Sequence, residues 1–275
     1  MMARPGQPRT SAGTPSRRWL WIAALLGAVW ALFWQAPASW LAQGVWRASA
    51  QRLMLAQAQG TWRDGAALLV LEGGPGSRGA TMLPGMLRWR IDLGGLWRGA
   101  PALRLDWPAV SPEPLLVQFH LGWARWTAAL RPGGAGAWQG ALPLTLLDGL
   151  GTPWNTVALR GQARFTLDAV HLESAAGRMR FAGHLRVDLP DVASRLSALA
   201  PIGSYVLTVV GQGADARVTL HSDKGPLLLQ GQGEWNGQSL RFSGTARAAP
   251  GSEAALGNLL PIFGQREGDH VRIAI

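Results

Sequence analysis

The sequence contains no cysteine, a single lysine (Lys224), a single tyrosine and few acidic residues. Without cysteine the chain cannot form disulfides, a zinc finger or a thiol nucleophile, so its stability must come from apolar burial and strand pairing. The first acidic residue is Asp64, and the formal charge of the 275 residues is +10. Arginine carries nearly all of the positive charge.

Positive charge by itself permits nucleic acid as a partner. Outside the N-terminal tail, however, the arginines alternate with apolar residues at period two and form no basic run, which is typical of the solvated face of a β-sheet. We therefore expect no nucleic-acid partner. Anionic lipid headgroups or acidic surfaces of other proteins fit the charge better.

A long apolar segment follows the basic N-terminal tail. No charged residue lies between Trp19 and Trp46, and the residues from Trp19 to Trp34, as a helix, would cover ~24 Å of a ~30 Å hydrocarbon layer. We predict a transmembrane helix over 19–38. Its expected membrane-anchoring residues are Trp19, Trp21, Leu25, Leu26, Trp30, Phe33 and Trp34.

Arg17 and Arg18 precede this segment and predict its orientation, because positive flanks stay in the cytoplasm. Residues 1–18 are then a disordered cytoplasmic tail, since their Pro, Gly and Ser content cannot bury enough surface to fold. Two alternatives remain: a signal peptide cleaved near 36–38, and a buried helix of a soluble protein.

Beyond a short juxtamembrane helix over 39–50, residues 51–275 read as a β domain. Alternation such as Leu87, Trp89 and Ile91 against intervening polar residues predicts half-buried antiparallel strands. Asn236-Gly237, between two alternating runs, predicts a hairpin with a type I′ turn. A soft subdivision over 132–153 is an alternative to one continuous domain.

Glycine recurs two residues after a large apolar residue on one face of these strands. Such glycines mark bulges, bends or close approaches of the backbone, which favours a curved sheet. The predicted fold class is therefore mainly β, a largely antiparallel sheet that forms a groove or partial barrel. One or two short helices are expected over 191–199 and 252–260. The alternative is that glycine makes room for neighbouring tryptophans. The expected groove-lining residues are Gly161, Gly183, Gly231, Gly244 and Trp235.

Residues that could carry catalysis are scattered. No two of the five histidines have metal-ligand spacing, and Asp188 and Asp191 beside Pro190 suggest a turn and a helix cap rather than an acid/base pair. No phosphate-binding loop or nucleophile elbow is complete. The sequence predicts no catalytic residue, no metal site and no cofactor, and hence a protein that is not an enzyme.

Four short motifs occur in an order that resembles the type II secretion system protein N family (general secretion pathway protein N). They are Gly60-Thr-Trp-Arg-Asp-Gly65, Leu87-Arg-Trp-Arg-Ile91, Ile202-Gly-Ser-Tyr205 and Leu259-Leu-Pro-Ile-Phe-Gly264. The resemblance implies an accessory component of the machinery that exports proteins across the outer membrane. It also implies a single-pass inner-membrane protein with its C-terminal domain in the periplasm and other secretion-system proteins as partners.

The sequence is also similar to the AsmA-like group of anchored proteins with groove-forming sheets linked to lipid handling. This second resemblance implies a periplasmic lipid-binding or lipid-transfer protein, and it is the alternative function.

Overall fold

The computed structural model describes residues 17–74, 79–123, 125–151, 154–175 and 178–274. Its chain divides into two compact units, residues 1–36 and residues 37–275. The predicted cytoplasmic tail, 1–18, lies outside the described residues except for the first two residues of a helix.

The first unit contains one described helix, α1 (Arg17–Trp34). It ends before the predicted limit at 38, because Pro37 has no N–H to donate and disfavours helical backbone at the residue before it. Most of its described apolar side chains, including Trp21, Leu25 and Trp30, are exposed. None of the helices in the described residues has the length and apolar character that a bilayer crossing requires.

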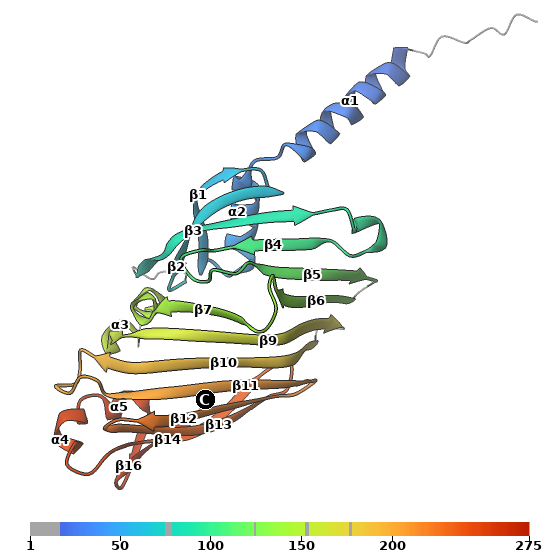
Figure 1. Ribbon diagram of the computed structural model, residues 1–275. Coiled ribbons are helices and arrows are strands. Elements are labelled where there is room, and N and C mark those ends of the chain that lie inside the picture. The colour runs from blue at the N-terminus through green and yellow to red at the C-terminus, as the bar shows by residue number, and fades with distance from the viewer. Residues whose placement is uncertain (1–16, 75–78, 124, 152–153, 176–177, 275) are drawn as a thin grey trace, which may run out of the picture. The chain divides into compact units, whose positions relative to one another are not determined.

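The second unit is mainly β, and its described residues form one antiparallel sheet of 16 strands (Figure 1). The strands of the first half are β1 (Leu53–Gly60), β2 (Asp64–Glu72), β3 (Ala80–Asp92), β4 (Ala102–Asp106), β5 (Leu115–Gly122), β6 (Arg125–Pro132), β7 (Trp138–Pro143) and β8 (Leu159–Arg160). Those of the second half are β9 (Gln162–Ala175), β10 (Arg178–Ser194), β11 (Gly203–Gly213), β12 (Ala216–Lys224), β13 (Leu227–Trp235), β14 (Leu240–Ala248), β15 (Gln265–Glu267) and β16 (His270–Ala274).

The sheet is open, with the order β1-β2-β3-β4-β5-β6-β9-β10-β11-β12-β13-β14-β16-β15. It is continuous across the predicted soft subdivision at 132–153, because β6 and β7 both pair with β9. β1 and β15 form its two edges. The prediction was a curved sheet that forms a groove or partial barrel. The sheet is antiparallel, as predicted, and it does not close.

The short helices of this unit are α2 (Ala38–Ala48), η1 (Leu96–Arg98), η2 (Leu144–Leu150), α3 (Trp154–Val157), α4 (Glu253–Leu256) and α5 (Leu260–Phe263). The predicted helix over 252–260 is present as the single turn α4, and a second turn, α5, begins at its last residue. The predicted helix over 191–199 is wrong: β10 continues to Ser194, with a bulge at Asp191, whose φ is 46°.

The predicted hairpin between β13 and β14 is present, but its turn is shifted by one residue. Asn236 donates its backbone N–H to the Ser239 carbonyl oxygen at 3.2 Å, so Gly237 and Gln238 are the central residues. Of these two only Gly237 has positive φ, at 85°. A type I′ turn needs positive φ at both central positions, so the predicted turn type is wrong.

One face of the sheet, called here the inner face, carries the buried apolar side chains. Near the first edge Trp89 is 3% exposed and donates its indole N–H to the Trp62 carbonyl oxygen at 3.0 Å. Leu41 of α2 packs against this cluster. α2, which corresponds to the predicted juxtamembrane helix over 39–50, therefore covers part of the sheet.

The larger core lies under the second half of the sheet. It includes Ile202 and Tyr205 of the β10–β11 region together with Leu227, Leu256 and Leu259, the last three completely buried. Each fully buried leucine of this kind contributes about 1.5–3 kcal/mol. α4, α5 and η2 thus close one end of the inner face (Figure 1).

Tyr205 provides a test of this core. It is 4% exposed and donates its hydroxyl to the Leu227 carbonyl oxygen at 3.1 Å. Burial raises its pKa above the ordinary value of about 10. Because the folded state retains the neutral phenol, the stability that Tyr205 contributes is present below pH ~10 and lost as the pH rises through the raised pKa.

We expect the ultraviolet absorbance of the phenolate to appear at higher pH in the native chain than in the urea-unfolded chain. Tyr205 is the sole tyrosine, so the signal has one source. Equal midpoints in the two states would contradict the buried position of Tyr205.

Candidate functional site

The inner face is continuous from strand to strand because the register places apolar residues opposite one another. Across β5, β6, β9 and β10, cross-strand partners follow the path Leu121, Trp126, Ser174 and Met179. Two residues further along each strand is a second row of cross-strand partners: Phe119, Ala128, Leu172 and Phe181. Side chains alternate between the two faces of a strand, so these rows all point to the inner face.

At the end of the sheet opposite η2, α4 and α5, this face opens into an apolar groove of about 330 Å³. Met179 and Leu240 are exposed at its margin. The groove is lined by Leu172, Met179, Arg180, Phe181, Leu185, Val209, Ala216, Val218, Trp235 and Leu240. Such a lining suits an acyl chain or another slender apolar ligand and offers no group for acid/base chemistry.

Two glycines leave room for phenylalanine rings near the groove. A Cβ atom added at Gly211 would collide with the Phe181 ring, and one added at Gly233 would lie 2.9 Å from Cδ2 of Phe242. Of the two rings, Phe181 lines the groove, so a larger residue at Gly211 would displace a lining side chain.

Only one of the five expected groove-lining residues borders this apolar groove, namely Trp235. Gly231 and Gly244 are cross-strand partners beneath a separate polar depression of about 530 Å³. Gly161 and Gly183 have φ of 126° and 127° at the irregular parts of β8–β10, where a Cβ on Gly183 would be 2.6 Å from the Ala169 carbonyl oxygen.

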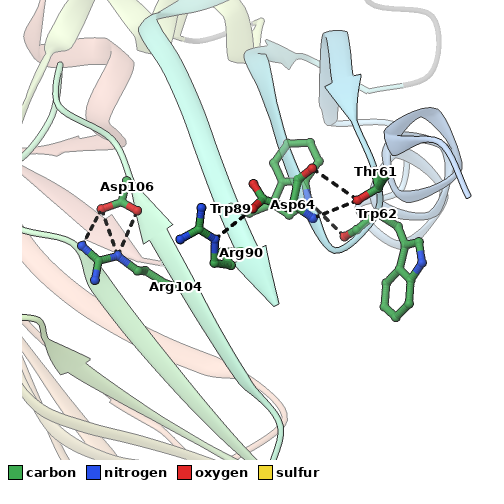
Figure 2. Close-up of polar contacts among 7 residues, drawn as sticks. All are labelled: Thr61, Trp62, Asp64, Trp89, Arg90, Arg104 and Asp106. Carbon is green, nitrogen blue, oxygen red and sulfur yellow. Dashed lines mark hydrogen bonds and ion pairs between the residues drawn. The ribbon is translucent and has the colours of Figure 1, made fainter. Parts of the chain in front are cut away.

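The opposite, outer face of the sheet carries ion pairs, two of which are drawn in Figure 2. Arg90 Nε lies 2.9 Å from Asp64 Oδ2, and Arg104 Nε lies 3.0 Å from Asp106 Oδ2. Each pair is largely exposed, so each contributes at most about 1 kcal/mol to stability. These arginines are engaged in ion pairs on a solvated face.

The two aspartates considered as an acid/base pair are held by separate cations. Arg186 Nη2 lies 2.8 Å from Asp188 Oδ1, and this hydrogen bond raises the pKa of Arg186. Lys224 Nζ lies 3.1 Å from Asp191 Oδ1. In the described residues no three histidine or acidic side chains gather closely enough to hold a metal ion.

The expected membrane-anchoring residues lie on α1. Trp21, Leu25, Leu26, Trp30, Phe33 and Trp34 are exposed, and the rings of Trp30 and Trp34 stack with centroids 5.5 Å apart. The side chains of Trp19, Arg17 and Arg18 lie outside the described residues. These residues are remote in sequence from the groove, and α1 belongs to the other unit.

The groove makes a matched pair of variants available on β11. Val209 faces the groove, whereas its neighbour Val210 faces outward between His184 and Arg217. We expect Val209→Glu to weaken binding of a fluorescent fatty acid by at least about tenfold, because a charge beside an apolar ligand costs more than about 1 kcal/mol.

Val210→Glu should leave the binding unchanged, because the new carboxylate meets water and Arg217. Equal affinities of the two variants, measured by fluorescence titration, would show that the groove does not bind the probe.

Comparison with known proteins identifies one family. Residues 51–274 match the family model of type II secretion system (T2SS), protein N. The match includes every strand of the described sheet and all four motifs noted in the sequence. No curated protein and no solved structure matches the chain.

Proposed function

The chain belongs to the type II secretion system protein N family, and from this premise we propose that it is a non-enzymatic accessory component of that machinery, anchored in the inner membrane. Family membership implies a type II secretion component of the bacterial envelope. The observation that carries the proposal is the family match across the entire β domain.

The anchoring part of the proposal rests on the N-terminal sequence. Two arginines precede α1 and two more begin it, the rest of the helix is uncharged, and its described apolar side chains are exposed. Burial of such a surface in lipid is favourable, and tryptophans at both ends suit the headgroup region. With the arginines in the cytoplasm, residues 51–275 lie in the periplasm.

The apolar groove supports a second function, lipid binding. A cavity of about 330 Å³ with ten lining residues, of which only Arg180 is charged, accommodates part of an acyl chain. This function is compatible with the first, since a secretion component anchored in a membrane has lipid within reach. Native mass spectrometry of the protein purified with its co-purifying lipids would support it by an added lipid mass.

Deleting the gene in its native host tests the secretion role. We expect substrates of the type II system to accumulate in the periplasm and to reach the medium again when the gene is restored. Unchanged secretion in the deletion strain would contradict the proposal.

Topology can be tested with a phosphatase reporter that is active only after export, fused after Gly60. We expect activity in the wild-type fusion and less activity after Arg17→Glu and Arg18→Glu, because the charge bias that orients the segment is weakened. The matched control, Arg47→Glu with Arg52→Glu, alters the same number of charges on the other side and should keep the activity.

A reporter that works only in the cytosol would contradict the orientation. Extraction of the membranes at alkaline pH distinguishes a retained anchor from a cleaved signal peptide. A protein with a retained anchor stays in the membrane fraction, whereas cleavage of a signal peptide releases the β domain.

A further inference from the structure

Exposed tryptophans gather at one end of the sheet. Trp97 in η1 is 97% exposed and Trp123 in the β5–β6 turn is 101% exposed, the two largest values among the exposed apolar side chains of the described residues. Leu96, Leu121 and Trp126 are also exposed beside them. These five residues are called the tryptophan rim.

The two turns that carry the rim are neighbours. The Leu121 backbone N–H donates to the Gly99 carbonyl oxygen at 2.8 Å, which ties the end of β5 to the turn containing Trp97. Trp126 is the cross-strand partner of Leu121. In Figure 1 the β3–β4 and β5–β6 connections lie at the right-hand end of the sheet, away from α3, α4 and α5.

The charge around the rim is mainly positive, with Asp92 as the acidic residue at the end of β3. Arg98 follows Trp97 directly, and Arg178 and Arg180 begin β10, which β9 separates from β6; within the described residues none of these three arginines forms an ion pair. Arg125 pairs with Glu173 at 3.3 Å. Tryptophan interleaved with unpaired arginine is the composition that binds the headgroup region of an anionic bilayer.

The chain enters the second unit at this same end. Pro37, the first residue of that unit, forms a β-bridge with Thr61 in the β1–β2 turn. In β2–β3 pairing Asp64 lies opposite Arg90, and in β3–β4 pairing Asp92 lies opposite Ala102, so the β1–β2 turn and η1 are at one end of the sheet. A segment anchored immediately before Pro37 would therefore keep this end beside the membrane.

We propose that the tryptophan rim rests on the surface of an anionic phospholipid bilayer, with Trp97 and Trp123 inserted at headgroup level and Arg98 and Arg178 against lipid phosphates. This inference rests on the proposed anchoring and adds which end of the sheet faces the lipid. The apolar groove lies toward the same end of the sheet, with Met179 and Leu240 at its margin.

The absence of cysteine makes single-site probes straightforward. The full chain, carrying an environment-sensitive fluorophore at one introduced cysteine, is placed in nanodiscs that contain anionic lipid. Emission is compared with and without a lipid-attached quencher, which lies at headgroup depth for positions 121 and 198 and in the acyl-chain region for position 25. Leu121→Cys reports on the rim, Ala198→Cys on the opposite end between β10 and β11, and Leu25→Cys on the proposed anchor.

We expect the quencher to cause a loss of emission at 121 and none at 198. Adding Trp97→Ser should reduce the loss at 121, whereas Trp154→Ser, which removes an exposed tryptophan at the opposite end, should leave it unchanged. A loss of emission at 121 that is no larger than the loss at 198 would overturn the inference.

The probe at 25 reads the anchor independently. Quenching at 25 without quenching at 121 leaves the anchor standing and refutes contact of the rim with lipid. Quenching at 121 without quenching at 25 supports the rim and counts against the anchor. Quenching at 121 that is equal with anionic and with zwitterionic lipid would refute the role given to the arginines.

Discussion

The register of the antiparallel strands is the constraint on which the rest of the structure depends. Most strands alternate between apolar and polar residues, and a shift of one residue in such a pairing would turn its apolar row to water. Bulges or irregularities interrupt the pairings β1–β2, β2–β3, β9–β10, β10–β11 and β11–β12, while the rows from β5 to β10 keep apolar residues on one face. Core and groove are two parts of that single face. Leu121 and Trp126 of the rim continue it, whereas Trp97 and Trp123 lie in the connections at the end of the sheet.

What differs along the face is what covers it. At one end Leu256 and Leu259 bring two helical turns onto the sheet and exclude water. At the other end the same apolar rows continue without such cover and form the groove and the rim. An isolated apolar side chain on a surface is ordinary, but a contiguous apolar surface with positive margins marks a binding site.

The motifs shared with the protein N family maintain the fold. Trp89 fills the small cluster under α2, Gly65 leaves space for its ring, and Tyr205 and Leu259 lie in the large core. A substituted Cβ at Gly65 would be 2.6 Å from Cζ2 of Trp89. The family resemblance is therefore carried by residues that set the shape of the sheet, and the binding surfaces lie elsewhere.

Much of the fold could be predicted from the alternation of apolar and polar residues. In a strand, residues two positions apart share a face, so the alternation identifies which side chains lie together. The mainly β class, the β13–β14 hairpin and the polar outer face follow from it. The groove residues Met179 and Val209 could not be identified this way, since alternation does not tell which part of an apolar face a helix covers. The predicted helix at 191–199 failed because pairing of β10 with β8 and β11 outweighed local helix signals around Asp191.

The most direct measurement of this account is disulfide formation across β6 and β9, two strands that are not consecutive in sequence. Ala128 and Leu172 are cross-strand partners on the inner face, whereas Glu173 is directed to the outer face. Ala128→Cys with Leu172→Cys is expected to cross-link on mild oxidation, because paired Cα atoms lie roughly 4.5–5.5 Å apart. Ala128→Cys with Glu173→Cys should remain reduced. Cross-linking of the second pair and not of the first would place the apolar row on the outer face and contradict the account.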